Sequence, residues 1–182
     1  MKLSFKTFST KGIVLKRVNV GETDRMINLL TQEYGKLTCV AKGVRKIKSS
    51  NRAYLEPGNL INAFMIRTKS LPLLTQVILI DDCSKMKQTL GSFRQLSQML
   101  EIFEKLFVEQ ELEQEIFSKV LNLRKKISSS TASRIFVKKT LTEIITGLGF
   151  QDPKDSKYLT ITDYISALSD RKMKSFDYLN VK

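Results

Sequence analysis

The sequence of 182 residues has no histidine and no tryptophan, and it has only two cysteines and three prolines. Histidine is the commonest general base and a common metal ligand, so its absence excludes Ser–His and Cys–His nucleophile pairs and every histidine-bound metal site. Cys39 and Cys83 are far apart and lack the paired spacing of a zinc site or a redox motif, so we expect two buried thiols. We therefore expect a protein that is not an enzyme and that uses no metal, no cofactor and no small-molecule substrate.

Long apolar runs and nucleotide-binding glycine patterns are also missing. The longest purely aliphatic run, Val77–Ile80, is far too short to cross a bilayer, and the N-terminus has no apolar signal region. The one Gly-Lys pair, Gly35-Lys36, has neither the upstream glycine nor the following Ser or Thr of a P-loop. We expect a cytoplasmic, nucleoid-associated protein that does not bind membranes.

Positive charge, in contrast, is abundant: Lys and Arg number 31, Asp and Glu number 18, and the net charge is +13. Clustered cations favour polyanion partners, because phosphates attract them and release their own counterions. The excess is denser in residues 1–82, which carry 14 basic and 6 acidic side chains, than in residues 83–182, which carry 17 and 12. This charge predicts a nucleic-acid partner, with a generally basic surface as the alternative.

From Gly12 to Asp82 the sequence alternates between β-branched runs and turn residues, which is typical of short strands. Five strands are predicted: Ile13–Val20, Arg25–Gln32, Lys36–Ala41, Leu60–Arg67 and Leu73–Ile80. Residues 1–11 contain three lysines and no acid, and we expect a frayed basic arm there. Five strands in about 70 residues indicate a small barrel or sandwich, of which the OB-fold is a five-stranded example.

After Cys83 the apolar residues recur with the period of amphipathic helices. Three helices and a short fourth are predicted: Phe93–Phe107, Leu112–Ile127, Val137–Leu148 and Thr162–Leu168. Ser92 and Gln95 have the spacing of a capping box at the start of the first helix. The sequence therefore predicts an α+β protein, with an N-terminal five-stranded OB-fold barrel in residues 1–82 and an α-helical C-terminal domain in residues 83–182.

An acid-free cluster of cations lies between the third and fourth predicted strands, in residues 42–52. In the strand before it, the alternation of side chains puts Lys36 on the polar face that leads to this cluster. Tyr34 and Tyr54 flank the region as candidate base-stacking platforms, with packing in turns as the alternative. The residues predicted to bind nucleic acid are Arg17, Arg25, Tyr34, Lys36, Lys42, Arg45, Lys46, Lys48 and Arg52.

The predicted helical half has a different charge pattern. Its first part is rich in glutamate, and such a surface would repel a phosphate backbone. We predict that a protein partner, rather than nucleic acid, binds the face formed by Glu101, Glu104, Glu109, Glu111, Glu113 and Glu115. The apolar stripes of the helices are expected to pack against each other and the barrel rather than to form a cofactor pocket.

Several short segments occur together in the order and at the spacing of a known family. The segments are Lys11–Arg17, Gly21–Arg25, Leu30–Lys36, Val40–Arg45, Lys48–Ser50, Leu55–Pro57 and Leu71–Thr75. In them the chain resembles the start of the RecO family of bacterial recombination mediators, in which Leu-Gln-Pro is common where this chain has Leu-Glu-Pro. The likeness covers residues 11–82 and continues more faintly through residues 141–150 and 170–175.

The resemblance implies an OB-fold that binds single-stranded and double-stranded DNA, anneals complementary strands, works with RecR-type and single-strand-binding proteins, and assists recombinase loading during repair. Many family members carry a zinc-binding cysteine cluster soon after the segment that matches Gly149-Phe150. This chain has no cysteine there, and its helical domain is shorter than usual, so a zinc site is not implied. Two alternatives are an RNA-binding OB protein and a protein–protein adaptor that has kept the scaffold.

Overall fold

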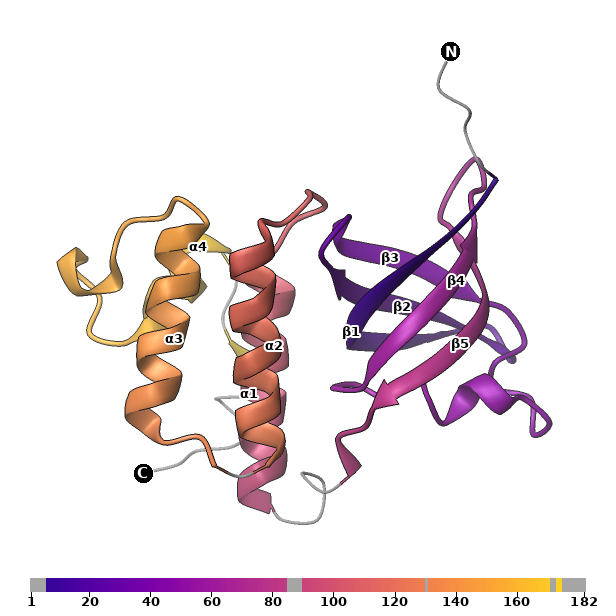
Figure 1. Cartoon of the computed structure of the whole chain (residues 1–182), viewed down its shortest axis with the longest axis horizontal. Helices are drawn as coiled ribbons and strands as arrows, with labels where there is room; N and C mark the ends of the chain where they lie inside the picture. Colours follow the sequence, from indigo (N-terminus) through magenta and orange to yellow (C-terminus); the bar gives the residue numbers. More distant parts are fainter. Residues whose placement is uncertain (1–5, 85–89, 130, 171–172, 175–182) are drawn as a thin grey trace. The chain divides into compact units, whose positions relative to one another are not determined.

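The computed structural model describes residues 6–84, 90–129, 131–170 and 173–174 (Figure 1). In this part of the chain five strands precede four α-helices, which confirms the predicted α+β class. The strands are β1 (Thr7–Val20), β2 (Asp24–Thr31), β3 (Gly35–Ala41), β4 (Leu60–Ile66) and β5 (Leu73–Asp81). The α-helices are α1 (Leu90–Leu106), α2 (Gln114–Ser128), α3 (Arg134–Gly147) and α4 (Ile161–Leu168). The chain divides into two compact units, residues 1–82 with 109–112 and residues 83–108 with 113–182.

The five strands form a closed barrel in the order β1-β2-β3-β5-β4. The long strand β1 closes it, because its first half pairs with β4 and its second half pairs with β2, both antiparallel. Strand β3 meets β5 in parallel at Val40 and Leu73, and a closed barrel has no exposed sheet edge. This arrangement confirms the predicted five-stranded OB-fold.

Alternating side chains build the core of the barrel, as the sequence predicts. Along β2 and β3 buried residues alternate with partly exposed ones, because successive side chains of a strand point to opposite faces. The inward residues form one apolar cluster: Val14, Ile27, Leu29, Leu37, Cys39, Ala41, Val44, Leu55, Ile61, Ala63, Met65, Leu74 and Val77. Both cysteines are buried, as expected, and neither is in a disulfide.

Strand β1 begins well before the predicted boundary. Residues Thr7–Lys11 pair with β4, so the expected frayed arm is wrong for them, and residues 1–5 of that arm lie outside the described residues. The alternation of this segment explains the difference, because Thr10 is buried and Phe8 packs against the core while the lysines stay exposed. In the sequence, the basic composition of this segment made its alternating strand pattern hard to recognise.

Gly12 occupies the point where β1 passes from one neighbouring strand to the other. It pairs with Thr31 of β2 and with Ile61 of β4. A Cβ atom here would lie 2.9 Å from Thr31 Cγ2 and 3.1 Å from the carbonyl oxygen of Leu30. Only glycine fits this close approach without moving a backbone.

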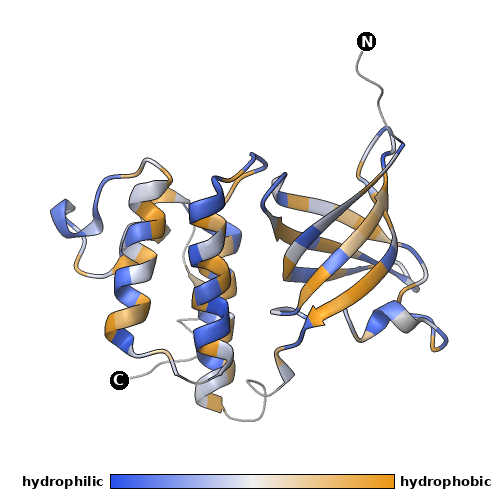
Figure 2. Ribbon diagram, viewed as in Figure 1, coloured by the Kyte–Doolittle hydropathy of each residue, from blue (hydrophilic) through white to orange (hydrophobic). Residues whose placement is uncertain are grey.

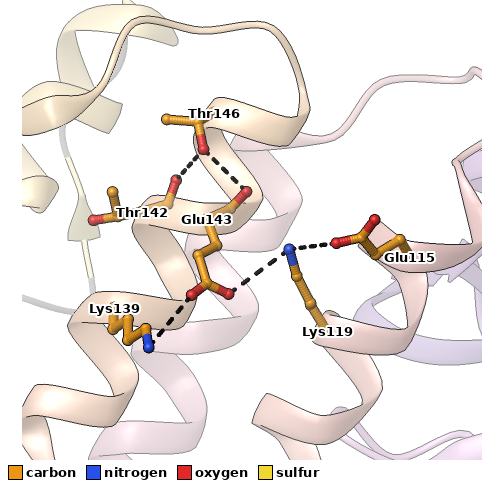
Figure 3. A network of polar contacts seen from close by, with 6 residues as sticks. All are labelled: Glu115, Lys119, Lys139, Thr142, Glu143 and Thr146. Atoms are coloured by element: carbon orange, nitrogen blue, oxygen red, sulfur yellow. Dashed lines mark hydrogen bonds and ion pairs between the residues drawn. The ribbon is translucent and has the colours of Figure 1, made fainter.

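The second unit contains the amphipathic helices, which carry both apolar and hydrophilic residues in Figure 2. Polar contacts link α2 to α3, as Figure 3 shows. Lys119 Nζ lies 2.8 Å from Glu115 Oε1 and 3.7 Å from Glu143 Oε2, and Lys139 Nζ lies 4.0 Å from Glu143 Oε1. The side chains of these pairs are partly or fully exposed to solvent, so the pairs contribute little to stability.

The helix starts differ slightly from those predicted. Leu90 already lies in α1, so Ser92 is inside the helix and the predicted capping box is wrong. The chain caps α3 and α4 instead with hydroxyl groups, since Ser133 Oγ and Thr160 Oγ1 each accept a hydrogen bond from a backbone N–H three residues later, both at 3.1 Å. Among the described residues, no helix combines the length and the apolar character that crossing a membrane would require.

Candidate nucleic-acid interface

The segment between β3 and β4, residues 42–59, carries most of the predicted binding residues and lies at one end of the barrel (Figure 1). It is anchored at two points, because the side chains of Val44 and Leu55 are buried in the barrel core. Near its end, the Gly58 N–H donates to the carbonyl of Val14 at 2.8 Å, and the Val14 N–H donates to the carbonyl of Asn59 at 2.9 Å. This connection, which we call the cationic loop, is therefore a packed part of the barrel.

Asp24 fixes the start of the cationic loop. Its Oδ1 accepts hydrogen bonds from the Gly43 N–H at 2.7 Å and from the Thr23 hydroxyl at 2.9 Å. These bonds, together with the positive charges of Lys42 and Lys46, lower the pKa of the Asp24 carboxyl. Gly43 has a φ of +64°, a left-handed conformation that glycine adopts without strain.

Arg45 also holds the cationic loop in place. Its backbone N–H donates to the carbonyl of Thr23 at 2.9 Å, and its guanidinium NH1 donates to the carbonyl of Gly21 at 2.9 Å. The side chain thus ties the loop to the turn between β1 and β2. The sequence predicted Arg45 as a binding residue, and the structure gives it an anchoring contact as well.

Three lysines of the cationic loop, Lys42, Lys46 and Lys48, are exposed to solvent. Ile47 lies among them and is 96% exposed, although isoleucine is usually buried. We call these four residues the lysine tip. It combines exposed charges that can contact phosphates with an apolar side chain that can contact bases.

A second group of cations lies on the inward face of the strands next to the loop. Directly opposite residues of antiparallel strands share a face, and Arg17 lies opposite Ile27 while Asn19 lies opposite Arg25. Because Ile27 belongs to the core, Arg17 and Arg25 continue the inward face. The buried Arg25 guanidinium donates through Nε to Asn19 Oδ1 at 3.2 Å.

Positive charges surround Arg25. Burial lowers the pKa of its guanidinium, and the charges of Arg17, Arg52 and Arg45 lower it further, while Glu56 acts in the opposite direction. Glu56 forms an ion pair with Arg17, and both side chains are about one third exposed. We call Arg17, Arg25, Arg45 and Arg52 the arginine cluster.

Two predicted residues lie away from the cationic loop. Tyr34 and Lys36 are at the start of β3, which separates them from Lys42 by the length of that strand, about 20 Å at the usual rise per residue. The Tyr34 ring packs 5.0 Å from that of Phe8, and its hydroxyl accepts a hydrogen bond from Arg67 at 3.3 Å. The structure therefore does not bring Tyr34 to the lysine tip.

Tyr54 is partly buried against the barrel core. This position agrees with the alternative that Tyr54 packs in the structure instead of serving as a base-stacking platform. Sequence reasoning missed the stack at the start of β3, in which the Arg67 guanidinium lies 4.5 Å from the centre of the Phe8 ring. A cation over an aromatic ring is stabilised by the ring quadrupole. Phe8 was not considered as a stacking residue because it was expected to lie in a frayed arm.

The glutamates between Glu101 and Glu115 do not form one helical face. Glu109, Glu111 and Glu113 lie between α1 and α2, and residues 109–112 belong to the barrel unit, where the Leu112 N–H donates to the carbonyl of Gln32 at 2.8 Å. Of the six glutamates in the predicted face, α1 and α2 contain only Glu101, Glu104 and Glu115. A partner surface here would need to be built from fewer glutamates.

Burial raises the pKa of the Cys39 thiol to about 12, so this cysteine is protonated at neutral pH and is a poor nucleophile. Within residues 6–84, 90–129, 131–170 and 173–174, no three acidic or cysteine side chains gather in a way that could hold a metal ion.

Comparison with known proteins places the barrel in a family. Residues 1–82 match the family described as "Recombination protein O N terminal". The barrel is therefore similar to the N-terminal domain of the RecO family. The chain is similar to proteins named DNA repair protein RecO from Cutibacterium acnes, at 34% identity over 71 residues, from Rubrobacter xylanophilus, at 31% over 94 residues, and from Bifidobacterium longum, at 39% over 69 residues.

These matches cover only part of each protein. They include 39%, 52% and 38% of this chain, and 29%, 34% and 29% of the three RecO relatives, respectively. The chain thus matches about a third of the length of each relative. The cationic loop, which follows β3, lies inside the matched domain.

Proposed function

We propose that this chain acts in DNA repair and recombination by binding single-stranded DNA along the cationic loop. The supporting observation is that the barrel presents this loop in an anchored form, with three exposed lysines beside an arginine cluster. An anchored loop loses little conformational entropy on binding, which favours affinity. Phosphate contacts supply most of the binding energy and no sequence preference.

The finer activities are those that the resemblance to the RecO family implies, and they are part of the proposal. Binding two single strands through exposed cations would screen their mutual repulsion, which is what strand annealing requires. We propose that the chain anneals complementary strands, assists recombinase loading, and does so with RecR-type and single-strand-binding proteins. It acts in this role as a binding protein without catalysis of its own.

Fluorescence anisotropy with the full chain tests the binding step. A labelled single-stranded DNA should bind with a log-log salt slope that corresponds to several phosphate contacts, at about 0.7 per contact. Oligonucleotides of the same sequence in single-stranded RNA and in duplex DNA are the matched competitors. An absence of salt-dependent DNA binding would refute the proposal and favour the adaptor alternative, and a clear preference for RNA would favour the RNA-binding alternative.

A further inference from the structure

The arginine cluster contains a buried donor without a partner. Arg25 is 7% exposed, and its NH1 is fully buried with no hydrogen-bond partner among the described residues. Leaving a buried donor without a hydrogen-bond partner costs free energy, and the cost is larger for a charged donor. Such a group therefore calls for an explanation other than folding. The inward face of a barrel strand would more simply carry an apolar residue at this position.

Among the described residues whose charges shift the pKa of Arg25, Glu56 is a carboxylate and the other three are arginines. Glu56 is held by Arg17, one of those three. A carboxylate and a phosphate each present pairs of oxygen acceptors that bind guanidinium groups through charge-assisted hydrogen bonds. The Glu56 carboxylate on Arg17 therefore marks a position that an external anion could take.

We propose that the arginine cluster is a binding site for a single phosphate group of the nucleic-acid backbone, and that Glu56 blocks it in the free protein. An entering phosphate replaces the Glu56 carboxylate on Arg17 and accepts a hydrogen bond from the orphan NH1 of Arg25. Arg45 and Arg52 add positive charge around it. This site rests on the proposed function for its natural ligand, but its anion chemistry can be measured without DNA.

The test uses inorganic sulfate as the probe, since sulfate has the shape of a phosphate group and does not titrate near neutral pH. The melting temperature of the full chain is followed against low-millimolar sulfate, with chloride holding the ionic strength constant. An anion that binds only the folded state raises the melting temperature by mass action. We expect a saturable rise for the wild type.

Glu56→Gln should strengthen the response, because the amide removes the competing charge. An ion pair of this exposure is weak, so the half-saturating sulfate concentration should fall about fivefold. Glu22→Gln is the matched control, since Glu22 is an exposed residue of the β1–β2 turn and loses the same charge without releasing Arg17. It should leave the sulfate response close to that of the wild type.

Arg25→Met should abolish the saturable response while keeping the melting temperature in chloride at or above that of the wild type. A role of Arg25 in folding alone predicts the opposite, namely a lower melting temperature and an unchanged response. If Arg25→Met does not fold, the Glu56→Gln result decides. Equal sulfate responses of the wild type and Glu56→Gln would overturn the inference even if single-stranded DNA binds, whereas saturable sulfate binding without DNA binding would refute the proposed function and leave the anion site standing.

Discussion

Removing the three exposed charges of the lysine tip gives the most direct test of how the cationic loop is used. The variant Lys42→Gln, Lys46→Gln, Lys48→Gln leaves Asp24, Arg45 and the buried anchors of the loop untouched, so the barrel should keep its stability. If each lysine contacts one phosphate, the magnitude of the log-log salt slope for single-stranded DNA should fall by about 2, at about 0.7 per contact. The advantage of the wild type should then shrink about 20-fold between about 50 and about 200 mM salt.

Anisotropy titrations of a labelled single strand at four or more salt concentrations measure this slope. The matched control is Lys125→Gln, Lys126→Gln, Lys138→Gln, which removes the same charge from exposed positions of α2 and α3. It should lower affinity slightly through the long-range field and leave the slope unchanged. Equal slopes for the wild type and the lysine-tip variant, or equal losses in the two variants, would refute the assignment of phosphate contacts to this loop.

Three further changes test individual contacts. Gly12→Ala should destabilise the barrel by about 1–3 kcal/mol in chemical denaturation because its methyl group meets a carbonyl oxygen, whereas Gly91→Ala, which meets nothing within 4 Å in α1, should be neutral or stabilising by up to about 1 kcal/mol; a neutral Gly12→Ala would contradict the close approach. Asp24→Asn should cost stability at neutral pH, and because the folded-state pKa of Asp24 is lowered, the difference from the wild type should be full above its ordinary value of 3.8 and vanish as the pH falls through the lower folded value; a difference that persists in acid would mean that charge is not the cause. Ile47→Ala should leave the melting temperature unchanged and weaken single-strand binding by about fivefold, about 1 kcal/mol, without altering the salt slope, and a changed slope would exclude an apolar contact.

Periodicity in the sequence predicted most of the secondary structure. The alternation in β2 and β3 and the helical spacing after Cys83 are strong because one face of each element must be buried. The boundaries of β2 to β5 accordingly lie within one residue of those predicted. The start of β1 was missed, since its lysines resemble a solvated arm although Phe8 and Thr10 alternate inward.

The candidate site was harder to predict, because proximity along the chain does not fix proximity in space. Tyr34 and Lys42 are eight positions apart, yet an extended strand separates them. Asp24 and Gly43, in contrast, are distant in sequence and hydrogen-bonded. The inward direction of Arg25 could have been recognised, since it alternates in register with the core residue Ile27.

That register connects stability to function in this barrel. Replacing a buried, incompletely paired charge with an apolar side chain of similar size is often neutral or stabilising, so folding alone does not explain an arginine at position 25. The same burial that makes the charge costly also strengthens its attraction for an anion, because the surrounding dielectric constant is lower than that of water. A phosphate that accepts a hydrogen bond from NH1 would therefore supply the partner that NH1 lacks in the free protein. When no nucleic acid is bound, the charge of Glu56 reduces the free-energy cost of burying Arg25. By this reasoning Arg25→Met should yield a more stable barrel that binds anions less well. Arg25→Gln keeps a polar group at the position but removes the charge. Loss of both stability and sulfate binding in Arg25→Gln would show that anion binding needs the charge and that stability needs apolar packing at this position.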